Sequence, residues 1–137
     1  MGIIKVVCGV IYDNDKVFIC RRKEGKSLAS FWEFPGGKVE QNETDKIALK
    51  RELQEELEME INIIGLVGQS NHDYGSFQVE LFGYACDLVN YQGKLTDHDA
   101  YKWVDIAKLD EYKLAPADIP IKRMIENKNR TTKPKLH

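Results

Sequence analysis

The sequence predicts an α/β protein with a single domain, built from several β-strands and three helices. Three observations predict this class. Runs of β-branched and aromatic residues recur between turn residues, the segment 44–59 has no Gly or Pro and spaces its Leu residues as a helix does, and an amphipathic segment follows Pro120. The length of 137 residues suits one domain. We expect this domain to span residues 1–128 and residues 129–137 to form a flexible basic tail.

The composition is that of an ordinary globular protein, and it excludes several classes of function. The formal net charge is −2, so no global basic field attracts a nucleic acid polymer. Cys8, Cys20 and Cys86 are odd in number and lie in apolar runs, which indicates buried thiols in a reducing compartment. No run approaches membrane-spanning length, and the first residues lack a signal-peptide pattern. We therefore expect a cytoplasmic protein that acts on small molecules, as a monomer or homodimer.

The first third of the chain predicts a β-hairpin followed by a short aromatic strand. Residues 3–12 are apolar and β-branched and end in turn chemistry, and residues 16–22 alternate as a second strand that finishes with a basic pair. Residues 31–34 form an aromatic strand that Pro35 halts. We interpret Gly36-Gly37 as a tight turn that lets a ligand approach the backbone closely.

A helix is predicted from Asn42 or Thr44, either of which can cap it, to about residue 59. Glu52, Glu55 and Glu56 stand at positions i, i+3 and i+4, so they fall within one narrow arc of this helix. Like charges this close repel, and a hard divalent cation held by carboxylate oxygens is the simplest compensation. The alternative is a solvated charged face of the helix.

The second half predicts further strands, a short helix and a final helix. Residues 61–67 form a strand with a bulge at Gly65, and residues 69–75 are either a polar connection or its continuation. The later elements are a strand at 77–89, an acidic loop at 96–100, a short strand at 101–104, a short helix at 105–111 capped by Asp105, a rigid Pro-bounded loop at 114–120 and the last amphipathic helix.

The helix and its approach resemble a known signature. Gly37, Glu43 and the run Arg51-Glu52-Leu53-Gln54-Glu55-Glu56 match, in identity and spacing, the motif of the Nudix hydrolases. Glu58 departs from that motif, which has Gly there at the end of the helix, so we expect a different helix C-terminus. The resemblance implies an α/β/α sandwich with a mixed β-sheet. It extends over residues 3–126 and is greatest to the MutT-type nucleoside triphosphate pyrophosphohydrolases, in particular their CTP pyrophosphohydrolase branch.

This resemblance implies a metal-dependent site. Its cofactor is Mg²⁺, for which Mn²⁺ can substitute, and hard cations of this kind prefer oxygen ligands. The implied ligands are the backbone carbonyl of Gly37 and the side chains of Glu52, Glu55, Glu56 and Asp97. We place Glu52 and Glu55 in the catalytic group, with Glu52 the leading candidate for the general base. Asp99 is the rival of Asp97.

The same resemblance assigns residues that support the motif and hold the phosphates. An ion pair between Glu43 and Arg51 orients the helix and its carboxylates. Arg22 and Lys38 resemble the residues that bind the phosphates, and two such cations allow local anion capture in an acidic protein.

Base recognition falls to Phe34, as an apolar or stacking wall, and to Asp118. An ionised Asp118 only accepts hydrogen bonds and suits an amine such as N4 of cytosine. A protonated Asp118 could donate to an oxidised purine, and Asp118 is also placed to cap the final helix.

The predicted function is Mg²⁺-dependent hydrolysis of nucleoside or deoxynucleoside triphosphates to the monophosphate and pyrophosphate, with CTP, dCTP or a modified dNTP as substrate. One alternative is a sanitation diphosphatase for 8-oxo-dGTP or another oxidised purine. A diadenosine polyphosphate hydrolase is a further alternative, because Tyr74 lies somewhat downstream of the motif. A non-catalytic nucleotide-binding module of the same fold is the alternative from another class, and the intact Glu52/Glu55/Glu56 set argues against it.

Overall fold

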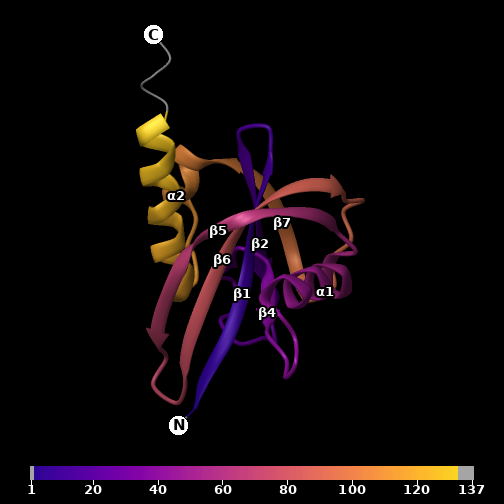
Figure 1. Ribbon diagram of the computed structural model, residues 1–137, viewed down its shortest axis with the longest axis vertical. Helices are drawn as coiled ribbons and strands as arrows, with labels where there is room; N and C mark the ends of the chain where they lie inside the picture. The colour runs from indigo at the N-terminus through magenta and orange to yellow at the C-terminus, as the bar shows by residue number, and fades with distance from the viewer. Residues whose placement is uncertain (1, 133–137) are drawn as a thin grey trace.

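The computed structural model describes residues 2–132, and it contains one mixed β-sheet with a helix on each face (Figure 1). The strands are β1 (Ile3–Asp13), β2 (Lys16–Arg22), β3 (Trp32–Glu33), β4 (Gly36–Lys38), β5 (Glu60–Asp73), β6 (Gln78–Asn90) and β7 (His98–Asp105). The helices are α1 (Asp45–Leu57), the 3₁₀ helices η1 (Ile106–Glu111) and η2 (Pro116–Asp118), and α2 (Ile119–Thr132). The expected α/β/α sandwich is confirmed.

The sheet is organised around β1, which pairs in parallel with β6 and antiparallel with β2 and β4. The main order of strands is β3-β2-β1-β6-β5, while β4 pairs with β1 and β7 pairs with β2. Pairing of β3 and β7 with the same strand brings three distant segments together. Arg22 aligns with His98, and Cys20 aligns with Glu33. A cation, an imidazole and a carboxylate therefore meet at one end of β2.

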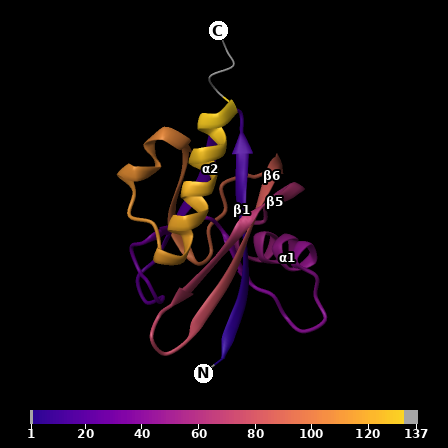
Figure 2. The same ribbon diagram turned by 60° about the vertical axis from the view of Figure 1, so that its left-hand side comes forward.

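Helices α1 and α2 lie on opposite faces of the sheet (Figure 2), and each covers an apolar cluster. Leu49, Leu53 and Leu57 of α1 are fully buried in one cluster, as their helical spacing requires. Ile121 and Ile125 of α2 belong to the other. The cysteines Cys8, Cys20 and Cys86 are all buried and free, which confirms their expected role as small core residues.

Helix α1 begins as expected and ends in an unexpected way. The Oγ1 atom of Thr44 accepts a hydrogen bond from the backbone N–H of Ile47 at 3.2 Å, so Thr44 is the cap. The helix stops at Leu57 because Glu58 adopts the left-handed conformation (φ 49°, ψ 42°), and the N–H of Glu58 bonds the carbonyls of Leu53 and Gln54. The expectation of a different helix end was wrong. Glu58 takes the backbone conformation that usually favours Gly.

Three local interpretations are corrected by strand pairing and side-chain contacts. Gly36-Gly37 is part of strand β4, not a tight turn, and a Cβ atom at Gly36 would lie 1.9 Å from the carbonyl oxygen of Val7. Close approach of two strands explains this glycine. Strand β7 begins at His98, within the expected acidic loop. Asp105 makes no side-chain capping bond to η1 and pairs with Lys16 at 3.1 Å instead.

Strand β5 and helix α2 are longer than the strand and the helix that the simplest interpretation of the sequence predicts. Strand β5 is continuous from Glu60 to Asp73, with a register shift between Ile63 and Gly65, so the bulge and the strand continuation are confirmed. Helix α2 runs to Thr132, because no Gly or Pro ends the helix before that point, and the flexible tail from residue 129 stays a prediction. The remainder of the expected tail, residues 133–137, lies outside the described residues. Among residues 2–132, no helix is long and apolar enough to cross a membrane.

Candidate active site

A cavity of about 570 Å³ opens between the C-terminal half of α1, the β2–β3 region and η2. Its walls include most of the residues that the sequence assigned to function, together with Glu33, which it did not. These are Arg22, Glu33, Phe34, Gly37, Lys38, Glu52, Glu56 and Asp118. A cavity of this size with apolar walls and convergent charged groups is typical of a site for a small ligand.

The acidic end of this cavity is formed by Glu52 and Glu56, one turn apart on α1. Their carboxyl groups interact, so each of them shifts the pKa of the other. Burial, together with the nearby charges of Glu52, Glu33 and Asp97, raises the pKa of Glu56 to about 9. Burial also raises the pKa of Glu52, whereas the Arg51 guanidinium lowers it. Such a concentration of carboxylates lacks sufficient positive charge, so its donor set fits a divalent cation.

Gly37 lies directly against this acidic end. A Cβ atom added there would lie 2.3 Å from Cδ of Glu52, so any side chain would displace the carboxylate. This contact places the backbone of β4 beside Glu52, as the expectation of a carbonyl ligand at Gly37 requires. The coordinating role of that carbonyl stays a prediction.

Arg51 forms hydrogen bonds that link the separate parts of the acidic motif. Its guanidinium donates to both oxygens of Glu43, at 2.6 and 2.8 Å, and these hydrogen bonds lower the pKa of Glu43 to about 2. It also donates to the carbonyl of Lys38 at 3.1 Å and to Glu52 at 3.3 Å. The expected Glu43–Arg51 ion pair is therefore present, and it ties the start of the motif and β4 to α1.

Glu55 and Asp97 do not line the cavity. The side chain of Glu55 is 60% exposed and accepts a hydrogen bond from Arg51 at 3.2 Å. Asp97 pairs with Lys26 at 3.3 Å, yet it is near enough to raise the pKa of Glu56. Asp99, its rival, is bound to Arg21 at 2.7 Å. The metal roles of Glu55 and Asp97 stay predictions, and both need their side chains to turn from these partners.

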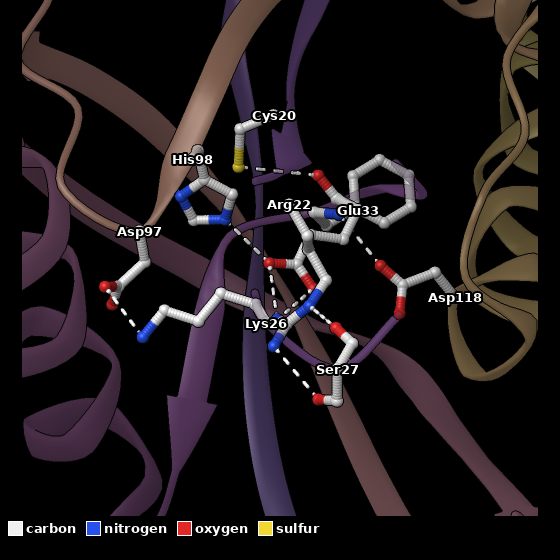
Figure 3. Close-up of polar contacts among 9 residues, drawn as sticks. Cys20, Arg22, Lys26, Ser27, Glu33, Asp97, His98 and Asp118 are labelled. Atoms are coloured by element: carbon white, nitrogen blue, oxygen red, sulfur yellow. Dashed lines mark hydrogen bonds and ion pairs between the residues drawn. The ribbon is translucent and has the colours of Figure 1, made fainter. Parts of the chain in front are cut away.

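Arg22 is held at the opposite wall by two neighbours (Figure 3). Its Nη1 atom lies 3.2 Å from both carboxylate oxygens of Glu33, and its other nitrogens donate to the carbonyl and hydroxyl of Ser27. Lys38 also lines the cavity. The two cations thus face the same space as the carboxylates of α1, and phosphate binding by them stays a prediction.

Asp118 and Phe34 line the same cavity as Arg22 and Glu33, and Figure 3 shows Asp118 on the side of Glu33 away from His98. Asp118 is only 7% exposed, and its Oδ2 atom accepts a hydrogen bond from the backbone N–H of Phe34 at 2.8 Å. Burial raises the pKa of Asp118 well above its usual range, with a further contribution from the charge of Glu33. The carboxyl group therefore joins η2 to the end of β3.

Glu33 and His98 are the two residues of this region that sequence reasoning missed. Glu33 lies between Trp32 and Phe34 in an aromatic strand, and a lone acid in such a run is the signal that could have indicated it. His98 is buried, and its Nε2 atom lies 2.7 Å from Oε2 of Glu33. Its lack of metal-type spacing with the other histidines concealed it, because its partner comes from a distant strand.

Comparison with known proteins places this site in a family. The NUDIX domain family matches residues 6–124, which is most of the chain. The chain belongs to the Nudix family. The CTP pyrophosphohydrolase of Escherichia coli (strain K12) is 34% identical over 123 residues, covering 88% of this chain and 90% of that protein. The 8-oxo-dGTP diphosphatase of Proteus vulgaris is 40% identical over 95 residues, covering 69% and 83%.

Solved structures agree with this assignment. The solution structure of the E. coli ORF135 protein has a TM-score of 0.84 at 31% identity, covering 98% of this chain and 95% of that one. The MutT protein from Methanosarcina mazei Go1 has a TM-score of 0.83 at 27% identity, covering 96% of each. This Nudix protein is a hydrolase that acts on pyrophosphate bonds, so the enzyme prediction is confirmed and the non-catalytic module is not supported.

Proposed function

We propose that this Nudix hydrolase converts nucleoside triphosphates to the monophosphate and pyrophosphate with Mg²⁺ as cofactor, and that CTP and dCTP are its preferred substrates. The observation that carries the proposal is the cavity itself, because it joins a carboxylate pair on α1 to two cations and a base-sized apolar wall. The 34% identity with a CTP pyrophosphohydrolase supports the choice of nucleotide. Small nucleotides fit a cavity of this size better than a polymer does.

Residues of this chain would hold the metal and carry the proton. The donor set for Mg²⁺ is Glu52 and Glu56, with Gly37, Glu55 and Asp97 as the further expected ligands. When bound, the metal supplies Lewis-acid charge stabilisation to the phosphate chain. Glu52 accepts the proton of the attacking water as general base, while Arg51 fixes its orientation through the 3.3 Å contact.

Arg22 and Lys38 bind and orient the phosphates from the other side of the cavity. Their charges offset those of the triphosphate locally, which a protein of net charge −2 cannot do through a global field. Arg22 presents a planar fork to phosphate oxygens, and Lys38 a point charge. Bringing the phosphates between these cations and α1 fixes the reacting geometry, which is the main contribution of a protein to phosphoryl transfer.

The base is read by Phe34 and Asp118. In the CTP proposal, the ionised carboxylate of Asp118 accepts a hydrogen bond from N4 of cytosine through Oδ1, because Oδ2 is used by the N–H of Phe34. A second candidate function is hydrolysis of an oxidised purine such as 8-oxo-dGTP. The specific observation in its favour is the burial of Asp118, which raises its pKa and favours a protonated group that donates.

The decisive experiment measures Mg²⁺-dependent pyrophosphate release from CTP, dCTP, 5-methyl-dCTP, dGTP, 8-oxo-dGTP and 2-hydroxy-dATP, for the wild type and Asp118→Asn. Asn keeps an acceptor for Phe34 but presents an amide donor to the base. We expect Asp118→Asn to lower kcat/KM for CTP by roughly 10- to 100-fold, the usual effect of a mismatched buried hydrogen bond.

The two candidates differ in their response to this substitution. A donating Asp118 predicts that Asp118→Asn retains activity on 8-oxo-dGTP, and a wild type that prefers oxidised purines would overturn the CTP proposal. Asp105→Asn is the matched control, because Asp105 lies at the end of β7 and pairs with Lys16. Absence of turnover of any nucleotide with Mg²⁺ or Mn²⁺ would overturn the proposed reaction itself.

A further inference from the structure

His98 occupies an unusual position at the start of β7. It is 4% exposed, and its Nε2 atom lies 2.7 Å from Oε2 of Glu33. Its Nδ1 atom is buried and has no hydrogen-bond partner among the described residues. A buried polar atom without a hydrogen bond lowers the stability of the fold. The hydrogen bond between Nε2 and Glu33 is therefore the polar contact that orients the ring. Where the carboxylate accepts this bond, Nε2 carries a hydrogen and donates it.

The carboxylate of Glu33 is shared between His98 and Arg22 (Figure 3). His98 takes the shorter contact, at 2.7 Å, whereas Nη1 of Arg22 lies 3.2 Å from both oxygens. Ion pairs between a guanidinium and a carboxylate usually have contacts of 2.7–2.9 Å, so the Arg22–Glu33 pair is long. A single nitrogen divided between two oxygens also lacks the bidentate fork that makes such pairs strong.

We propose that His98 is a positioning residue that holds Glu33 back from Arg22 and thereby keeps the Arg22 guanidinium available for the phosphates of the substrate. The inference rests on the proposed function only in taking a phosphate chain as the ligand of Arg22. Without His98, Glu33 is free to close on Arg22 as a full ion pair. A phosphate would then have to break that pair before it could bind, so its affinity would fall.

Cys20 lies in the same cluster, and a metal ion is the competing explanation. The donor atoms of Cys20, Glu33 and His98 come within 4.8 Å of one another. A metal would have to replace the existing hydrogen bond between His98 and Glu33 and would lie beside the Arg22 cation. Burial also raises the pKa of Cys20, which favours the thiol over the thiolate that ligates metals. The hydrogen-bonded arrangement is therefore the favoured one.

Variants of His98 test the proposal through ligand binding. We expect His98→Leu to weaken binding of inorganic triphosphate in EDTA by about tenfold, measured by calorimetry, and to raise KM more than it lowers kcat. His98→Gln keeps an amide donor near the Nε2 position and should bind within about twofold of the wild type. His98→Asn is too short to reach Glu33 and should behave as His98→Leu does, which provides a second variant if the leucine protein fails to fold.

A double-mutant cycle with Glu33→Gln tests whether His98 influences triphosphate affinity through Glu33. In that background Arg22 has no carboxylate to pair with, so His98→Leu should change triphosphate affinity by less than about twofold. Cys20→Ala is the matched control, because Cys20 is also buried and its thiol donates to the backbone carbonyl of Glu33, not to its carboxylate. It should bind triphosphate as the wild type does.

Three results would overturn the proposal. One is wild-type affinity in His98→Leu at an unchanged Tm, and another is an equal loss of affinity in the Glu33→Gln background. The third is a Zn²⁺-dependent rise in Tm that Cys20→Ala abolishes, since it would place a metal between His98 and Glu33. Because inorganic triphosphate binding needs no turnover, these results are independent of whether the nucleotide panel identifies a substrate.

Discussion

The substitution Glu56→Gln tests the charge arrangement of the cavity in the metal-free protein. Burial and the charges of Glu52, Glu33 and Asp97 raise the pKa of Glu56 from its ordinary value of 4.5 to about 9. The unfolded chain ionises this group near 4.5, so between these two pH values the folded state binds one more proton than the unfolded state. Stability must therefore fall as the pH rises through this window. Glutamine does not titrate, so it removes this dependence.

The magnitude follows from proton linkage. Each pH unit within the window changes the free energy of unfolding by about 1.4 kcal/mol, so raising the pH from 5 to 7 removes about 3 kcal/mol. For a domain of this size, 1 kcal/mol corresponds to roughly 3–5 °C in Tm. We therefore expect the Tm of the wild type to fall by roughly 10 °C relative to Glu56→Gln over this range. Partial exposure of Glu56 to solvent makes this the upper limit.

Thermal unfolding followed by circular dichroism in EDTA, at pH 5, 6, 7 and 8, measures this difference. Addition of Mg²⁺ should raise the Tm of the wild type more than that of Glu56→Gln, because the ion neutralises the carboxylates and binds the folded state. Glu60→Gln, at an exposed position at the start of β5, is the control and should follow the wild type. Parallel curves of Tm against pH for the wild type and Glu56→Gln would refute the reasoning.

Two further predictions concern the ends of the motif. Glu58→Gly should raise Tm by a few degrees over Glu58→Ala, because Gly relieves about 1 kcal/mol of left-handed strain that both Glu and Ala retain; equal Tm values would contradict the strain. Arg51 lowers the pKa of Glu43 to about 2, so the pair stabilises the fold above about pH 4.5 and loses this contribution as the pH falls toward 2. Glu43→Gln should therefore have a lower Tm than the wild type at pH 6 and match it near pH 2, and a constant gap between the two would rule this out.

The elements that the sequence predicted well are those whose causes are local. The start of α1 follows from the side chain of Thr44, and its buried face follows from the spacing of Leu49, Leu53 and Leu57. The motif around Glu52 was predictable for the same reason, because its residues come from one helix and from the β-strand that precedes this helix. Pairing between distant strands was less accessible. Gly36 belongs to β4 because the backbone of Val7 lies against it, and its immediate neighbours do not show this contact.

The arrangement of Glu52, Glu55 and Glu56 was only partly predictable. Helical spacing fixes the positions of their Cα and Cβ atoms but not the direction in which each carboxylate points. Glu52, Glu55 and Glu56 do share one side of α1, yet Arg51 draws Glu55 outward while Glu52 and Glu56 turn to the cavity. Arg51 itself was assigned only to Glu43. Its contacts with Lys38 and Glu52 depend on the docking of β4 against the helix, which is a tertiary event.

Base preference is the clearest case in which the identity of a residue is insufficient. Asp118 suits cytosine when ionised and an oxidised purine when protonated, and the amino acid is the same in both cases. Burial of Asp118 at the end of η2 and the charge of Glu33 favour the protonated form, while the N–H of Phe34 favours the ionised form. Since His98 and Arg22 hold the Glu33 carboxylate, they also influence the charge that Asp118 experiences. We therefore expect selection of the base and capture of the phosphates to be coupled through Glu33, so that a change at His98 alters both.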